Sequence, residues 1–152
     1  MTNEPMPVIT AAEVLSQTRF FGDLSAAQLQ KVAALGEIHD CSEGEPIYRI
    51  GEPALNMYVL VRGMVRMAVG YGGRNASAGD VLRRGDVFGW AALTPSCNRR
   101  LATATCLTPC TFLSINGERL LELMEHDHTL GYRLMTQLSS LITGTLTAFA
   151  GG

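Results

Sequence analysis

The sequence predicts a mainly β domain with flanking helices, folded as an antiparallel sandwich, barrel or jelly roll. Short apolar or alternating runs recur between glycine-bearing turns across residues 37–115, and helical periodicity is confined to the segments before and after them. The chain has 152 residues, of which 47% are hydrophobic and 17% are charged, which suits one compact core. We expect one domain over residues 1–152, with N-terminal helices at about 10–36, a β-roll at 37–115 and C-terminal helices at 116–150.

Two short helices are expected at the start of the chain. Ala11–Gln17 carries a weak helical pattern. Ser25 is typical of an N-cap, and Gln28 three residues later completes the pattern of a capping box. Gly36 is the expected C-terminal stop of this second helix, because glycine commonly follows the last helical turn.

Eight short strands are expected in the middle of the chain, with turn residues between them at nearly even spacing. This arrangement favours an antiparallel architecture over a parallel α/β sheet. Tyr71–Ala78 is expected to be a hairpin tip. The expected strands are Glu37–Cys41, Pro46–Arg49, Met57–Val61, Val65–Val69, Val81–Leu82, Val87–Phe88, Ala102–Cys106 and Thr111–Ile115.

Helical periodicity returns after Asn116, a good N-cap, and a final helix is expected from about Thr129 to Ala148. Its apolar residues form two faces. One is a coiled-coil seam of Leu134, Leu138, Leu141, Thr145 and Ala148, and the other consists of Met135, Ile142, Leu146 and Phe149. We expect one face to pack on the β domain and the other to pair with a second copy, giving a homodimer through Leu134–Ala148. The segment is too short and too polar to span a membrane.

One segment carries recognisable chemistry. Gly89 allows a sharp turn from a strand into a single helical turn of small residues, whose backbone N–H groups could hold an anion. Arg100, eleven residues further on, could reach back and bind a phosphate in bidentate fashion. By pattern alone, Arg99 and Arg100 could equally be solvated loop residues.

Several motifs, in order and spacing, resemble the cyclic-nucleotide-binding domain of the catabolite-activator (Crp/Fnr) family. They are Phe20–Ser25, Gly51-Glu52, Met57–Val65, Gly85–Gly89 and Arg100–Ala104, and the resemblance covers about residues 18–149. It implies a double-stranded β-helix, or jelly roll, with N-terminal helices and a long C-terminal dimerisation helix that closes over the ligand. It also implies a cyclic nucleotide, such as cyclic AMP, as the bound cofactor.

The resemblance implies a ligand-binding set of Phe88, Gly89, Trp90, Ala91, Ala92, Arg100, Leu101, Ala102 and Thr145. Gly89–Ala92 corresponds to the family's phosphate-binding turn, Arg100 to its phosphate-binding arginine, and Thr145 to a hydroxyl that faces the base. Trp90 replaces the usual glutamate that accepts a hydrogen bond from the ribose 2′-hydroxyl, and an indole only donates. Losing that bond costs about 1.5–3 kcal/mol, or a tenfold to hundredfold drop in affinity. Leu101 replaces a smaller or hydroxyl-bearing residue.

Two functions therefore stay open. In the first, the domain is a non-enzymatic sensor that binds a small anionic ligand, with Trp90 contacting its ring and Thr145 reporting occupancy to the dimer helix. In the second, Trp90 fills the pocket and the domain is a dimerisation or protein-interaction module. The chain could also be the truncated sensor half of a transcription regulator, since it stops before any helix-turn-helix.

The remaining features favour a cytoplasmic protein without direct nucleic-acid contact. The net charge is −2, and the N-terminus lacks a secretory signal. No catalytic motif is present, so we do not expect an enzyme. Cys106 and Cys110 are poor tetrahedral partners, so the cysteines are expected to be buried or half-buried thiols and no metal site is expected. His126 and His128 are expected at solvated helix ends.

Overall fold

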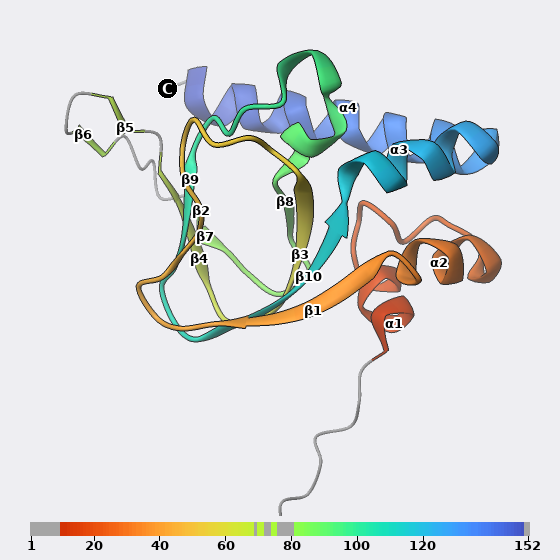
Figure 1. Cartoon of the computed structure of the whole chain (residues 1–152), viewed down its shortest axis with the longest axis horizontal. Helices are drawn as coiled ribbons and strands as arrows, with labels where there is room; N and C mark the ends of the chain where they lie inside the picture. The colour runs from red at the N-terminus through yellow and green to blue at the C-terminus, as the bar shows by residue number, and fades with distance from the viewer. Residues whose placement is uncertain (1–9, 69, 72–73, 76–80, 151–152) are drawn as a thin grey trace, which may run out of the picture.

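The computed structural model describes the backbone of residues 10–68, 70–71, 74–75 and 81–150, and their side chains except at 70–71, 74–75, 97 and 145–150. Eight strands form two four-stranded sheets whose paired strands are antiparallel (Figure 1). The first sheet has the order β1 (Gly36–Cys41), β10 (Cys110–Asn116), β3 (Asn56–Arg62) and β8 (Val87–Phe88). The second has the order β2 (Pro46–Tyr48), β9 (Thr103–Cys106), β4 (Val65–Ala68) and β7 (Val81–Leu82).

These strands correspond to the eight that the sequence predicts, and the predicted jelly-roll class is confirmed. A further pair, β5 (Gly70–Tyr71) and β6 (Arg74–Asn75), overlaps the predicted hairpin tip at Tyr71–Ala78, and the rest of that tip is outside the described residues. The central strands β3 and β10 are buried along most of their length, whereas the edge strand β1 is largely exposed. Near-continuous burial of a central strand requires cover on both faces of the sheet, and here the helices supply the outer cover.

Four helices flank the roll: α1 (Ala11–Ser16), α2 (Ala26–Ala33), α3 (Gly117–His126) and α4 (His128–Ala150) (Figure 1). The predicted N-caps are confirmed: Ser25 and Gln28 form the reciprocal capping box, and the Asn116 side chain accepts a hydrogen bond from the backbone of Arg119. The predicted stop at Gly36 is wrong. Helix α2 ends at Ala33, its C-cap is Ala34 in right-handed geometry, and Gly36 begins β1.

The buried apolar residues form two clusters on opposite sides of the first sheet. The helix-side cluster joins all four helices to the outer face of that sheet, and its fully buried members include Phe21, Met57, Leu113, Leu120 and Leu134. The roll cluster lies between the two sheets and consists of Tyr48, Tyr58, Leu60, Val65, Phe88, Ala104, Cys106, Cys110 and Phe112. The interior of the roll is thus aromatic and sulfur-containing, whereas the helix side is mainly aliphatic.

The first half of the predicted coiled-coil seam of α4 packs in the core of the same chain. Leu134 and Leu138 are buried in the helix-side cluster, and Leu141 packs against it. Of the second predicted face, Met135 is exposed while Ile142 also packs on the cluster. The side chains of Thr145, Leu146, Ala148 and Phe149 lie outside the described residues. Among the described residues, no helix combines the length and the hydropathy needed to cross a membrane.

Candidate functional site

The turn after β8 has a conformation that requires glycine. Gly89 has φ +78°, in the left-handed region, and the chain then enters a short 3-10 helix at Trp90–Leu93. A Cβ atom at this position would lie 2.9 Å from Arg100 Nη1 and 3.0 Å from Tyr58 Cδ2. Gly89 therefore provides both the backbone geometry and the space in which the arginine lies.

The Arg100 side chain is held in the interior by the backbone of two other segments. It is only 4% exposed, its Nη1 donates to the Gly89 carbonyl at 3.0 Å, and its Nη2 donates to the Asn56 carbonyl. The Arg100 backbone N–H donates to the Glu52 carbonyl at 2.9 Å, and the Arg100 carbonyl accepts from the Gly51 N–H at 2.8 Å. Both partners lie in the loop after β2. Arg100 is thus fixed at the point where the β2–β3 loop meets the Gly89 turn.

Aromatic rings cover one face of the Arg100 guanidinium. Its central carbon lies 4.0 Å from the centre of the Tyr48 ring and 5.6 Å from that of Tyr58. The stack continues into the roll, since the Tyr58 ring centre lies 5.3 Å from those of both Phe88 and Phe112. Burial raises the pKa of Tyr48 above its ordinary value, although Arg100 opposes this effect. Tyr48 is therefore a neutral phenol that offers its π face to the cation.

The Arg100 cation is not neutralised within the described part of the chain. No described carboxylate lies at ion-pair distance from it, and its buried Nε atom has no hydrogen-bond partner. A buried charge is costly unless it is paired and fully hydrogen-bonded, and cation–π contacts compensate only part of that cost. The Arg100 guanidinium therefore has an Nε–H group without an acceptor and lacks an anionic partner among the described residues.

The structure brings together part of the predicted ligand-binding set. Phe88 lies in the roll cluster beside Gly89 and Arg100, while Ala91 and Ala92 are buried in the helix-side cluster. Trp90 is partly buried and packs against the helix-side cluster, so it is not among the rings stacked inside the roll. Leu101 is 52% exposed, and Ala102 is buried. Thr145 belongs to α4, and its side chain lies outside the described residues.

Sequence reasoning missed the residues that surround the guanidinium. Tyr48 and Asn56 come from the end of one strand and the start of the next, and nothing local marks them as partners of an arginine far along the chain. Their contacts arise because β2 and β3 belong to different sheets that face each other. The sequence offers one general signal, since Tyr48 and Tyr58 are aromatic residues in expected strands and such rings can cover a buried cation.

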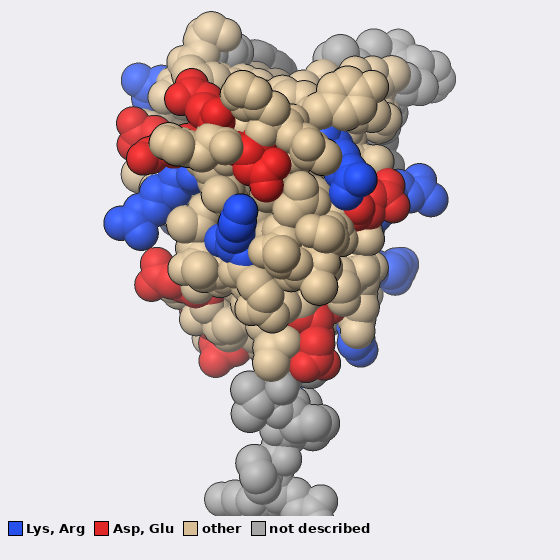
Figure 2. Space-filling model, turned by 90° about the vertical axis from the view of Figure 1, so that its right-hand side faces the viewer, with Lys and Arg blue, Asp and Glu red and all other residues tan. Residues whose placement is uncertain are grey.

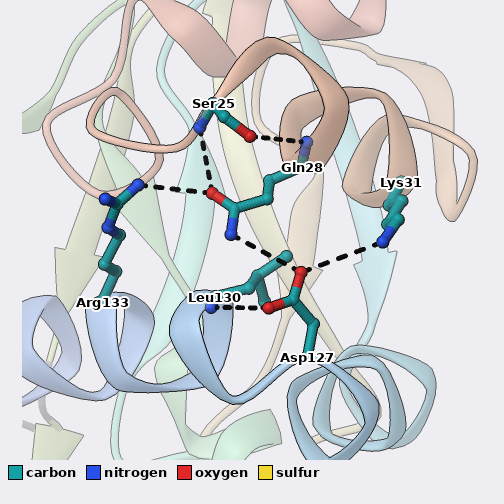
Figure 3. Close-up of polar contacts among 6 residues, drawn as sticks. All are labelled: Ser25, Gln28, Lys31, Asp127, Leu130 and Arg133. Atoms are coloured by element: carbon teal, nitrogen blue, oxygen red, sulfur yellow. Dashed lines mark hydrogen bonds and ion pairs between the residues drawn. The ribbon is translucent and has the colours of Figure 1, made fainter.

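A second polar site joins the N-terminal helices to the C-terminal ones (Figure 3). Its centre is the Gln28 side chain, whose carbonyl oxygen accepts from the Ser25 backbone at 3.0 Å and from Arg133 Nη1 at 3.4 Å. The Gln28 amide nitrogen donates to Asp127 Oδ2 at 3.5 Å. One buried amide thus contacts the start of α2, the turn between α3 and α4, and the first turns of α4.

Asp127 caps the first turn of α4. Its Oδ1 atom accepts a hydrogen bond from the backbone of Leu130 at 3.1 Å, and its Oδ2 atom lies 3.9 Å from Lys31 Nζ (Figure 3). The Leu130 hydrogen bond is the main cause that lowers the pKa of Asp127 below its ordinary value, with Gln28 and Lys31 adding to it against the opposing effect of burial. The carboxylate form is therefore favoured in the folded state.

We expect the docking of α4 to weaken in acid. Because the folded pKa is lowered, the stabilisation is complete above the ordinary pKa of about 3.9 and is lost as the pH falls through the folded value. Asp127→Asn keeps the capping oxygen but removes the charge. Thermal unfolding should show a lower Tm for this variant at neutral pH and a much smaller difference in acid. A difference that does not change with pH would contradict this expectation.

Charge on the surface gives no sign of a nucleic-acid interface on the face shown in Figure 2. Acidic and basic side chains are interspersed there, with uncharged surface between them. A phosphate backbone is bound by clustered positive charge, which this face lacks.

Within the described residues, no group of three or more His, Cys, Asp or Glu side chains is arranged to hold a metal ion.

Comparisons with known proteins agree with this architecture. Residues 38–127 match the family model of the cyclic nucleotide-binding domain. A structure from Geobacter metallireducens GS-15, provisionally assigned as a cyclic nucleotide-binding protein, is 26% identical with a TM-score of 0.76, and the match covers 90% of this chain and 98% of that one. No curated protein matches the sequence.

Two further solved structures share the fold. The sensor domain of the transcriptional regulator DNR from Pseudomonas aeruginosa is 23% identical with a TM-score of 0.73, covering 88% of this chain and 89% of that one. The regulatory domain of Toxoplasma gondii PKA, solved with cAMP, is 19% identical with a TM-score of 0.70, covering 90% and 48%.

Proposed function

Since this chain belongs to the cyclic nucleotide-binding domain family, we propose that it is a non-enzymatic regulatory domain that binds a small anionic ligand at Arg100. The observation that carries the proposal is the state of the guanidinium, which is 4% exposed, has an unpartnered Nε and lacks a described carboxylate partner. A phosphate ester, such as a cyclic nucleotide, would supply the missing charge and accept from the free donor.

Recognition would depend on rearranging contacts that Arg100 already makes. The Tyr48 ring covers one face of the guanidinium, so an anion would approach the edge that carries the N–H groups. Either Nη group could exchange its carbonyl partner for a phosphate oxygen, which gives a shorter and stronger charge-assisted bond. Because these carbonyls belong to the Gly89 turn and to the start of β3, ligand binding would alter both segments.

Trp90 sets an expectation about the sugar of a nucleotide ligand. The indole cannot accept a hydrogen bond from a ribose 2′-hydroxyl, and its ring packs toward the helix-side cluster. We therefore expect phosphate and base contacts to dominate the affinity.

Ligand occupancy would act by population shift: a ligand with different affinities for two arrangements of α4 would favour one of them. In this proposal α4 pairs with a second copy through its exposed face, which includes Tyr132 and Met135.

A second candidate function is favoured by the aromatic stack inside the roll. The rings of Tyr48, Tyr58, Phe88 and Phe112 contact one another beside Arg100, so side chains already fill the interior of the roll next to the guanidinium. In that case Arg100 is a structural residue that ties the Gly89 turn to β3 by its two carbonyl contacts. The domain would then act as an interaction module without a small-molecule ligand.

Trp90, the single tryptophan in the sequence, provides the test, since it adjoins Gly89 and is partly buried. We expect its fluorescence to change saturably on titration with cyclic AMP, cyclic GMP or a cyclic dinucleotide. Arg100→Ala should weaken that binding about a hundredfold or more, equivalent to about 2.7 kcal/mol. Arg100→Lys keeps the charge but loses the bidentate fork, so it should give an intermediate affinity.

Arg99→Ala is the matched control, because it removes the neighbouring guanidinium, which is exposed, donates to the Gly51 carbonyl and is outside the predicted ligand-binding set. Circular dichroism and thermal unfolding of each variant separate loss of binding from loss of the fold. A flat response of the wild-type protein to all three ligand types would contradict the sensor function and favour the interaction module.

A further inference from the structure

Two cysteines lie opposite each other where the first sheet ends at the β1–β2 turn. Cys41 is the last residue of β1, Cys110 is the first residue of β10, and the antiparallel register pairs them directly. The preceding pair in the same ladder is in side-chain contact, since the Thr111 hydroxyl donates to Asp40 Oδ1 at 2.7 Å. Residues that are far apart in the sequence are thus neighbours across the two strands.

The two thiols lie on the same face of the sheet. His39, two residues before Cys41, is paired with Phe112, two residues after Cys110, and the centres of their rings lie 5.7 Å apart. Side chains alternate between the faces of a strand, so Cys41 shares the face of His39 and Cys110 shares that of Phe112. The roll cluster contains Cys110 and Phe112, and Cys41 packs against it. Both thiols therefore belong to the roll side of the first sheet.

The spacing of the two strands suits a disulfide. Directly opposed residues of an antiparallel pair have Cα atoms about 4.5 or 5.5 Å apart, and both values lie within the range of about 4.4–6.8 Å found across disulfides. Their Cβ atoms are about 4.5–5.5 Å apart and must approach to about 3.5–4.5 Å. Because β1 is at the edge of its sheet, it can make this small approach.

The Cys110 side chain must also turn to meet its partner. Cys110 Sγ lies 3.2 Å from the Met64 carbonyl oxygen and 3.1 Å from that of Thr108. These are weak thiol hydrogen bonds, so rotation about the Cα–Cβ bond gives up little. In the reduced protein the two carbonyls therefore hold the Cys110 thiol in place without preventing it from reacting.

Access to solvent decides which thiol meets an oxidant first. Cys41 is partly buried, whereas Cys110 is 3% exposed. A dissolved oxidant therefore reacts with Cys41, because oxidation follows exposure. Cys106 is also buried, but it lies in β9 of the second sheet, where the register places it opposite Val65. Cys110 is thus the cysteine that the strand pairing presents to an oxidised Cys41.

We propose that Cys41 and Cys110 form a redox modification site, in which hydrogen peroxide drives the closure of a cross-strand disulfide. In the first step, the Cys41 sulfur attacks one peroxide oxygen and the O–O bond breaks, giving a sulfenic acid and one molecule of water. In the second, the Cys110 sulfur attacks the Cys41 sulfur and the S–O bond breaks. The departing hydroxide takes the proton of the Cys110 thiol and forms a second water. Two thiols lose two electrons, and one peroxide is reduced.

The bridge would fasten an edge strand to the centre of the first sheet. It would join the ends of β1 and β10 and close a loop that contains every strand between them. Closing a long loop restricts the unfolded chain, so the oxidised protein should have a higher Tm than the reduced protein. In Figure 1 the β1–β2 turn lies at the lower left, whereas α4 crosses the top. The cysteine pair therefore lies at the end of the roll away from α4.

Mass spectrometry of the intact chain tests the proposal. Cys97→Ser serves as the background, because it removes the fourth cysteine of the sequence. After treatment with hydrogen peroxide and alkylation of free thiols in denaturant, we expect loss of two hydrogen atoms and alkylation at one cysteine. Trypsin should release residues 32–49 linked to residues 101–119, and cleavage after Leu107 should leave the link on the fragment that carries Cys110. Dithiothreitol should separate the peptides and return the Tm to that of the reduced protein.

Serine variants in the same background complete the design. Cys106→Ser is the matched control, because it removes another buried thiol and should leave the bridge intact. Cys41→Ser and Cys110→Ser should abolish both the bridge and the rise in Tm, and circular dichroism checks that each variant is folded. The proposal is overturned if the peroxide-treated protein keeps all its thiols, if Cys41 only gains oxygen, or if the linkage runs to Cys106.

Discussion

Replacing Leu134 with alanine is expected to lower the free energy of unfolding by about 2–5 kcal/mol. The Leu134 side chain is fully buried in the helix-side cluster, so truncating it removes apolar burial and leaves a cavity between α4 and the first sheet. Chemical denaturation followed by circular dichroism measures the change. This would be a large fraction of the stability of a small domain, because net stabilities are about 5–15 kcal/mol.

Met135→Ala provides the matched control on the same turn of α4. Met135 is 43% exposed in the single chain, so at protein concentrations low enough to keep the protein monomeric its truncation should change the free energy of unfolding by less than about 1 kcal/mol. A large loss in Met135→Ala that does not change with protein concentration would contradict the placement of α4. A loss that grows with protein concentration would instead support the proposed pairing of α4 with a second copy through this exposed face.

Gly117→Ala is expected to destabilise the protein by about 1–3 kcal/mol, although alanine is the better helix former. A Cβ atom there would lie 2.3 Å from the carbonyl oxygen of Ala92 and 2.8 Å from its Cβ. These are atoms of the 3-10 turn that follows Gly89, so the turn or the start of α3 must move to admit one methyl group. The loss should therefore be accompanied by a change in Trp90 fluorescence.

Gly144→Ala tests the same substitution where space is available. Gly144 lies within α4, and no described atom is within 4 Å of the position that its Cβ would take. This variant should be about 0.5–1 kcal/mol more stable than the wild type, because alanine loses less backbone entropy in a helix. Opposite signs for the two glycine variants would support the close contact between α3 and the Gly89 turn, and equal effects would contradict it.

Much of the fold could be predicted because its signals are local. The capping box at Ser25 and Gln28, the N-cap at Asn116 and the glycine turns between strands each depend on a few neighbouring residues. Gly36 shows the limit of such signals. A glycine after a helical segment usually ends the helix, but here the chain leaves α2 earlier and Gly36 pairs with Ile115 in the first sheet.

The candidate site was predictable only in part. Gly89 and Arg100 could be found from spacing and family resemblance, and the structure places them in contact. The rings that cover Arg100 depend on how strands of two sheets face each other, and the pairing of Cys41 with Cys110 depends on the register of β1 and β10. Such contacts leave no periodic signature in the sequence, because each partner comes from a different strand.

The polar site around Gln28 has a consequence for the order in which the protein is made. Gln28 and Asp127 are 99 residues apart in the chain, and Arg133 donates to the carbonyl of Asp23 across 110 residues. During synthesis α2 leaves the ribosome long before Asp127 and Arg133 are made. The Gln28 side chain therefore lacks these two partners until α4 has been synthesised. The contacts between the N-terminal helices and α4 can therefore form only once α4 has been made, and contacts of such long range slow folding by the entropy of closing the intervening chain.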